Sequence, residues 1–338
     1  MKSIVFMVNT EYHLLLSVGI IQQYFNSGYK LLIYRVSPKD GTRLNNVCFN
    51  SSDIIYKQII YDYRHPQIHL KVHLNEIIDV HPDIFFFFLE NKFWMGYFFS
   101  RLHKKGTKII LGPDGMKAYS DYTVPLLSIV KNTFKGFVYS IESKIFFPPF
   151  VERCYATSKY IDEVWVDNKE KFKNRTNKKV IEFIIPHDES YVADLNKIFM
   201  VKKEDFLLMK EKTILFLDSP FSSEPYYDKT IHILKELQNK YTDRKLAIKL
   251  HQLSSNKARK KYRSISGVFF VESQYPAELY IANAKDCIVV SLISTSLLFY
   301  NPCCRYYWIY PMFKQIVDYS NIKNPTKHIK VVESIAEF

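Results

Sequence analysis

The sequence predicts an α/β fold with two Rossmann-like domains and a cleft between them. Short apolar runs typical of buried parallel strands alternate with longer amphipathic stretches typical of helices. The alternation occurs twice, and 338 residues with 47% hydrophobic content are enough for two cores. We expect an N-terminal domain over 1–190 and a C-terminal domain over 205–338, whose last helix could pack back on the N-terminal domain.

The first series begins with a short apolar run and continues with helical spacing of apolar residues, as in a strand followed by an amphipathic helix. A run of four phenylalanines is typical of a strand buried on both faces. The expected strands are 4–8, 30–36, 53–60, 83–89, 108–111, 163–166 and 181–185, and the expected helices are 14–24, 93–104 and 122–147.

A polar passage over 186–203 separates this series from the second one. The second series has the same alternation of short apolar runs and amphipathic stretches. Its expected strands are 213–217, 245–250, 267–271 and 287–291, and its expected helices are 230–240 and 277–283.

The formal net charge is +13, which would suit nucleic acid, an anionic membrane surface or a negatively charged substrate. No helix-turn-helix, zinc-finger or RNP pattern occurs, so we expect no nucleic-acid partner. Five cysteines without a Cys-x-x-Cys pair indicate free thiols in a reducing compartment. The N-terminal apolar run is too short for a signal peptide, and no apolar run is long enough to span a bilayer. These features predict a cytoplasmic protein, soluble or peripheral on an anionic membrane.

Several motifs are absent, which narrows the chemistry. The sequence has neither the G-x-G-x-x-G of nicotinamide enzymes nor the G-x-x-x-x-G-K-[ST] of P-loop enzymes. It contains no Asp-x-Asp, the motif that would hold a diphosphate through a divalent metal, and no G-x-S-x-G elbow.

The stretch Val289–Phe299 combines a strand pattern with four hydroxyl residues and a second apolar run. The hydroxyl residues are Ser291, Ser294, Thr295 and Ser296. A buried strand that leads into a helix start with free N–H groups and hydroxyls can bind a phosphate. The alternative is an ordinary helix N-cap on Ser291 or Ser294.

Asp114 follows the strand over 108–111, in the turn Gly112-Pro113-Asp114-Gly115. Ligands of open α/β sheets bind beyond the carboxyl ends of strands, where a carboxylate can act as a general base. The alternative is a turn selected for its backbone geometry.

His251 follows the strand Ala247–Leu250, and Glu278 lies at a helix start after Pro276. The histidine could donate to a phosphate leaving group, and the glutamate could accept hydrogen bonds from ribose hydroxyls. The alternatives are a structural histidine and an acid that complements the helix dipole. The order His251, Glu278, then the hydroxyl cluster would suit one sheet edge around a nucleotide phosphate.

Three short motifs resemble those of bacterial sialyltransferases, which are acidic-acidic-Gly, His-Pro and Ser-Ser/Thr. They are Asp114-Gly115, Lys249-x-His251 and Ser294-Thr295. The start of the chain, Val8–Leu15, resembles the Asn-Thr-Pro-Tyr-Gln-Leu-Leu of glycosyltransferase family 52 and its polysialyltransferase relatives, and Leu215–Phe221 is similar to the opening of their nucleotide domain.

Two residues depart from the pattern of these families. Pro113 replaces the first acid, and Gln252 replaces the proline of His-Pro. His-Pro occurs instead at His65-Pro66 and His81-Pro82, which precede Asp114 and which we interpret as structural.

The resemblance implies a GT-B enzyme that moves sialic acid, or a related nonulosonic acid, from its CMP conjugate to a hydroxyl of a surface glycan such as lipooligosaccharide or capsule. It implies inversion, no metal and no cofactor. Asp114 would be the base. His251, Ser294 and Thr295 would stabilise the CMP phosphate, with Ser291, Ser296 and Lys249 beside them and Glu278 on the ribose. Thr10, Tyr12 and Gly115 would contact the donor sugar.

Two other interpretations stay open at this point. One is a transferase of the same fold with another donor, such as a UDP-hexose, and the other is a non-catalytic relative that binds a glycan or nucleotide. A metal site on His65, His69 and His73 is disfavoured, because Pro66 interrupts their helical spacing.

Overall fold

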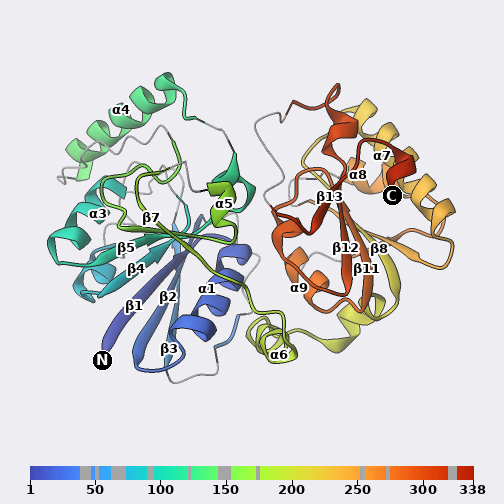
Figure 1. The fold of residues 1–338 in the computed structure, drawn as a ribbon. Helices are drawn as coiled ribbons and strands as arrows, with labels where there is room; N and C mark the ends of the chain where they lie inside the picture. The colour runs from blue at the N-terminus through green and yellow to red at the C-terminus, as the bar shows by residue number, and fades with distance from the viewer. Residues whose placement is uncertain are drawn as a thin grey trace. The chain divides into compact units, whose positions relative to one another are not determined.

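The computed structural model has two compact units, Met1–Pro186 and His187–Phe338. Each unit is built on one parallel sheet with helices packed against it (Figure 1). The structure describes residues 1–38, 47–49, 53–61, 74–89, 95–120, 123–143, 154–172, 176–251, 254, 256–271, 275–318 and 326–338.

The first sheet has the strand order β3-β2-β1-β4-β5-β6-β7. All neighbouring pairs are parallel, as expected for strands that alternate with helices. The strands are β1 (Lys2–Val8), β2 (Tyr29–Pro38), β3 (Ile54–Tyr61), β4 (Ile84–Phe87), β5 (Lys108–Leu111), β6 (Glu163–Val166) and β7 (Lys179–Glu182).

The helices of this unit are α1 (Glu11–Tyr24), α3 (Met95–Lys104), α4 (Leu126–Ser143) and α5 (Lys169–Phe172), with the 3-10 turn η2 (Gly115–Tyr119). The phenylalanines of β4 alternate between the two sheet faces. Phe85 packs edge-on against Phe98 of α3, whereas Phe86 stacks on Phe6 of β1. Phe6 in turn contacts Phe25 at the end of α1, so α1 and α3 cover opposite faces (Figure 1).

The second sheet has the order β10-β9-β8-β11-β12-β13, also parallel throughout. Its strands are β8 (Lys212–Leu217), β9 (Lys245–Lys249), β10 (Phe269–Phe270), β11 (Asp286–Ser291), β12 (Cys304–Trp308) and β13 (Ile329–Val331). The helical segments are α6 (Glu189–Ile198), η3 (Lys203–Lys210), α7 (Glu224–Lys240), α8 (Asn256–Tyr262), α9 (Ala277–Ala282), η4 (Thr295–Leu298), η5 (Tyr310–Phe313) and η6 (Ile335–Glu337).

Some boundaries differ from the sequence prediction for local reasons. α7 begins at Glu224, six residues before the expected start, because Ser223 and Pro225 suit the N-cap and the first turn of a helix. The passage over 186–203 contains α6, whose N-cap Asp188 accepts a hydrogen bond from the backbone N–H of Tyr191. The chain ends in the 3-10 turn η6, and Phe338 packs against Tyr307 in the core of the second unit.

The five cysteines all lie in the described ranges and are thiols that form no disulfide with one another. None of the helices within these ranges has both the length and the apolar character that crossing a bilayer requires.

Candidate active site

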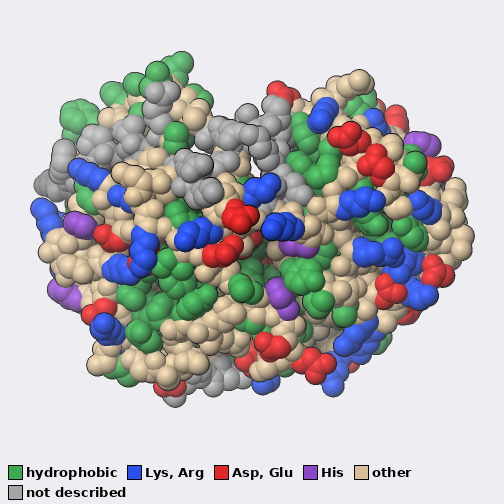
Figure 2. Space-filling model, viewed as in Figure 1, with side chains coloured by type: hydrophobic (Ala, Val, Ile, Leu, Met, Phe, Trp, Pro, Cys, Tyr) green, Lys and Arg blue, Asp and Glu red, His purple; other side chains and the backbone are tan. Residues whose placement is uncertain are grey.

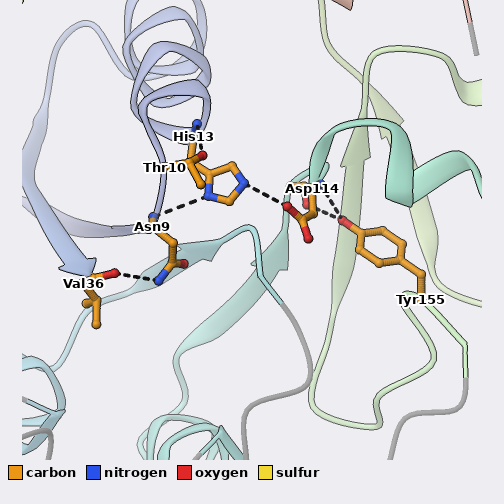
Figure 3. A network of polar contacts seen from close by, with 7 residues as sticks. Asn9, Thr10, His13, Val36, Asp114 and Tyr155 are labelled. Carbon is orange, nitrogen blue, oxygen red and sulfur yellow. Dashed lines mark hydrogen bonds and ion pairs between the residues drawn. The ribbon is translucent and has the colours of Figure 1, made fainter. Parts of the chain in front are cut away.

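In the first unit, a histidine and an aspartate meet beyond the carboxyl ends of the strands (Figure 3). His13 lies in the first turn of α1, and Asp114 lies three residues after β5. His13 Nε2 is 3.3 Å from Asp114 Oδ1. The histidine side chain is 2% exposed and the aspartate side chain 21%, so a buried imidazole holds a carboxylate that reaches solvent.

The hydrogen bonds of His13 indicate which ring nitrogen carries the proton. The backbone N–H of Asn9 donates to Nδ1 over 3.4 Å, so Nδ1 acts as the acceptor. In the neutral ring the proton is then on Nε2, which donates to Asp114. This donor orients the carboxylate, which can accept a proton from a substrate hydroxyl.

The turn after β5 approaches Phe88 so closely that residue 112 has to be glycine. A Cβ on Gly112 would lie 2.5 Å from Phe88 Cδ1 and Cε1. The Phe88 ring stacks on the His13 imidazole, with ring centroids 4.8 Å apart and planes 13° apart. The packing at Gly112 therefore sets the position of the Phe88 ring and, through it, the position of the His13 imidazole that contacts Asp114.

Tyr155 holds the backbone of the same turn. Its hydroxyl accepts a hydrogen bond from the Asp114 N–H at 3.3 Å and donates to the Gly112 carbonyl (Figure 3). Sequence reasoning missed Tyr155, because no motif links it to a turn 41 residues earlier in the chain. It also missed His13, although the N-terminal stretch that carried the family resemblance includes this histidine.

The residues predicted to contact a donor sugar have structural tasks at this site. Thr10 is the N-cap of α1, and its hydroxyl accepts a hydrogen bond from the His13 N–H at 3.2 Å. Tyr12 is buried. Gly115 has φ of 55°, a left-handed conformation that favours glycine. Their contact with a donor sugar stays a prediction.

A buried arginine of β2 lies beside the end of the neighbouring strand β1. Arg35 is 1% exposed and pairs in register with Val8. Its Nη2 is 4.0 Å from Glu11 Oε1, and its guanidinium also lies beside the Tyr56 hydroxyl, where it opposes the rise that burial causes in the pKa of that group. Arg35 is thus a buried cation near this end of the sheet, and its positive charge would attract an anionic substrate group.

In the second unit, three adjacent strands end side by side at Leu217, Lys249 and Ser291. The strand order changes direction between β8 and β11, which is the usual ligand position in such sheets. Ser291 Oγ donates to the Leu217 carbonyl at 2.8 Å and accepts from the Ser294 N–H at 3.3 Å. Hydrogen bonds within the fold therefore occupy the proton of the Ser291 hydroxyl and one of the two acceptor positions on its oxygen.

The helix expected after this strand is the single 3-10 turn η4. Ser294 is its N-cap and accepts a hydrogen bond from the Ser296 N–H at 3.3 Å. The turn stops because Phe299 is already extended and its carbonyl accepts from the Tyr306 hydroxyl. The hydroxyls are therefore presented on a short turn rather than on an α-helix.

Ser296 and Glu278 form a pair that the sequence could not specify. The Ser296 hydroxyl donates to Glu278 Oε1 at 2.8 Å, and both side chains are buried. Thr295 is partly exposed, and its hydroxyl makes no hydrogen bond within the ranges that the structure describes. Thr295 and Ser294 are thus the members of the cluster best placed for a ligand.

Lys249 and His251 continue the strand end of β9. Lys249 is buried, with its ammonium 5.2 Å from the centre of the Tyr280 ring on α9. His251 is half-buried two residues beyond the strand, and its carbonyl accepts from the Ser254 N–H at 2.9 Å. A cation and an imidazole therefore follow one another where β9 ends, close to the hydroxyl cluster that follows β11.

Asp218, which sequence reasoning did not select, anchors the segment that carries His251. Its Oδ1 accepts hydrogen bonds from the hydroxyls of Tyr226 and Tyr262, each at 2.8 Å. Its Oδ2 accepts from the Ser254 hydroxyl at 2.5 Å. Asp218 belongs to the stretch Leu215–Phe221 that resembles the nucleotide domain of the family, so a signal for it was present.

Two histidines lie close to η4. His328 Nε2 is 2.9 Å from the Leu297 carbonyl, and the His187 ring packs edge-on against Tyr300. Burial lowers the pKa of both histidines, and the proximity of His328 lowers the pKa of His187 further. The neutral form of both rings is therefore favoured.

Among the described residues, no group of three or more His, Cys, Asp or Glu side chains is placed to hold a metal ion. His65, Pro66, His69, His73 and Gln252 lie outside the described residues. His81 is described, and its Nε2 is 2.8 Å from Lys105 Nζ.

A model of the alpha-2,8-polysialyltransferase family matches residues 5–305 of the sequence. No individual curated protein matches it. The structure is similar to a UDP-GlcNAc 2-epimerase from Methanocaldococcus jannaschii, with a TM-score of 0.54, 10% identity, and coverage of 99% of this chain and 90% of that chain. It is similar to the S. aureus MnaA-UDP co-structure, with a TM-score of 0.52, 12% identity, and coverage of 91% and 79%.

A third similar structure is a sialyltransferase from Photobacterium damselae, over residues that correspond to its GT-B domain. The TM-score is 0.50, with 10% identity and coverage of 91% of each chain. At these identities the likeness concerns the fold, and it confirms the expected GT-B architecture of two Rossmann-like domains.

Proposed function

The chain belongs to the alpha-2,8-polysialyltransferase family, and we propose that it transfers sialic acid, or a related nonulosonic acid, from its CMP conjugate to a glycan hydroxyl. It is a glycosyltransferase with a GT-B fold. The observation that supports the proposal most directly is the contact of buried His13 with Asp114, the acid of the Asp114-Gly115 motif.

In the proposed reaction, Asp114 removes the proton of the acceptor hydroxyl as its oxygen attacks the anomeric carbon of the donor sugar. A new C–O bond forms while the bond from the anomeric carbon to the phosphate oxygen breaks. The electron pair stays on the phosphate, and CMP leaves. Attack opposite the leaving group inverts the anomeric centre. His13 is a positioning residue that orients Asp114.

The second unit would stabilise the departing phosphate, which gains negative charge. Hydroxyls of Ser294 and Thr295, with His251 and Lys249 at the end of β9, are donors that can replace a metal ion in this task. Glu278 would accept hydrogen bonds from the ribose hydroxyls. That a UDP complex is known for a protein of similar fold supports nucleotide binding by this architecture.

Arg35 supplies a further element of substrate recognition. Sialic acids carry a carboxylate, and the buried positive charge of Arg35 would attract such a group. We assign this electrostatic attraction to Arg35 because it lies near the same end of the first sheet as His13. We further propose a surface glycan such as lipooligosaccharide or capsule as acceptor, a cytoplasmic location and peripheral contact with the inner membrane.

The test is a transfer and hydrolysis assay with CMP-sialic acid, in which CMP release is measured. Asp114→Asn and His251→Ala should each lower kcat by about a hundredfold or more, because each removes a group that acts on a proton or on the leaving group. Arg35→Lys should mainly raise KM. Matched controls are Asp79→Asn and His232→Ala, which alter exposed residues of the same types.

Full activity of both variants would refute the assigned roles. Release of UDP from a UDP-hexose, with no release of CMP from CMP-sialic acid, would show that the donor is a UDP-hexose. Binding of CMP without turnover of any donor would instead indicate a non-catalytic role.

A further inference from the structure

The helix α4 exposes an apolar stripe along its whole length. The six large apolar side chains that form this stripe are 62–84% exposed. They recur at the three- and four-residue spacing that places side chains on one face of a helix. The stripe consists of Leu126, Leu127, Val130, Phe134, Phe137 and Ile141.

The less exposed residues of α4 are mostly small or polar. Asn132 and Ser140 are half-buried and Gly136 is buried, and the half-buried aliphatic residues among them are Ile129 and Val138. This distribution reverses that of an ordinary surface helix, whose large apolar side chains pack on the core. Hydrophobic side chains are accordingly visible at the surface over α4 (Figure 2). An exposed apolar patch of this extent marks an interaction surface.

The charges beside the stripe indicate what covers it. Lys131 and Lys135 are exposed and lie one turn apart along one border of the stripe. The whole chain carries a formal charge of +13. A helix with a Leu- and Phe-rich face, bordered by lysines, is typical of helices that lie in the interface of a bilayer. Lysine ammonium groups at this border can reach lipid phosphates while their stems lie against the apolar region.

We propose that α4 docks this chain on the surface of a bilayer that contains anionic lipids. The 18 residues of the helix lie along the membrane plane over about 27 Å, with the apolar stripe inserted between head groups. Lys131 and Lys135 pair with the lipid phosphates. This inference names the element responsible for the peripheral contact and does not require the proposed chemistry to be right.

The experiment is cosedimentation of the full chain with vesicles of phosphatidylcholine, with or without phosphatidylglycerol. The wild type should bind the anionic vesicles more strongly, and added salt should weaken this binding. Phe134→Ser with Phe137→Ser should reduce binding about a hundredfold, because two aromatic side chains no longer insert. Lys131→Gln with Lys135→Gln should reduce binding to anionic vesicles about tenfold.

The matched control is Ile184→Ser with Leu207→Ser, which removes two exposed apolar side chains that do not belong to α4. This variant should bind vesicles as the wild type does. Equal vesicle binding by the α4 phenylalanine variant and the wild type would overturn the proposal. The proposal would also be overturned if the stripe mediated self-association instead. In that case light scattering would show a dimer for the wild type but not for the phenylalanine variant, and the wild type would not bind vesicles.

Discussion

The close approach of Gly112 to Phe88 gives a prediction that links core packing to catalysis. In Gly112→Ala, the new Cβ would lie 2.5 Å from two carbons of the Phe88 ring, about 0.9 Å inside the 3.4 Å at which ordinary contacts begin. Forced overpacking of this kind costs about 1–3 kcal/mol. For a unit of this size the Tm of the first unit should fall by about 2–4 °C for each kcal/mol.

The same substitution should lower activity, because the Phe88 ring stacks on His13. A ring pushed by most of an ångström displaces the imidazole that orients Asp114, and a misplacement of about 1 Å can cost a hundredfold in rate. We therefore expect kcat to fall by about ten- to a hundredfold, measured as CMP release with saturating donor and acceptor.

Two further variants separate displacement from simple loss of stability. Gly28→Ala meets no atom within 4 Å but has φ of 79°, so it should lower the Tm through backbone strain and leave kcat unchanged. Phe88→Leu combined with Gly112→Ala should relieve the clash and recover much of the Tm. A Gly112→Ala protein with wild-type Tm and kcat would refute the reasoning.

Two other predictions concern the second unit. The pKa values of His187 and His328 are lowered by burial below the ordinary value of 6.5, so the unfolded chain binds more protons than the folded one as the pH falls through this value. The stability of this unit should therefore decline as the pH falls from neutral to acidic values. Tm measured against pH should change less steeply for His328→Gln than for the wild type, and equal slopes would contradict this prediction. Thr295→Ala should raise the KM for the proposed CMP donor with little change in Tm. Ser296→Ala should instead lower the Tm, because the Ser296 hydroxyl, unlike that of Thr295, is bonded within the described part of the protein. Equal effects in both assays would show that the two hydroxyls are not divided in this way.

Most strands of the two sheets could be predicted, because they are short, largely buried apolar runs at regular spacing. The sequence does not predict β12 and β13. β12 carries Arg305 within Cys304–Trp308, and β13 has only three residues, so neither has a clear apolar run. The turn after β5 and the strand end before His251 follow from sequence position alone, since strand ends meet at one sheet edge.

The partners of these residues could not be predicted in the same way. The contact of His13 with Asp114 joins residues far apart in the chain, and it depends on the strand order that places β1 and β5 on either side of β4. The hydroxyl cluster around Ser294 also looks uniform in sequence. Only the structure distinguishes Ser291 and Ser296, which are bonded inside the fold, from Thr295.

Asp218 has a consequence for how far the chain around His251 can move within the second unit. One buried carboxylate accepts hydroxyl hydrogen bonds from α7, from α8 and from Ser254, in the segment that follows His251. If this segment moves away, the carboxylate loses a partner in a site that water reaches poorly, which is energetically unfavourable. Ser254 is thus tied through Asp218 to two helices, and we expect its release from Asp218 to require local unfolding.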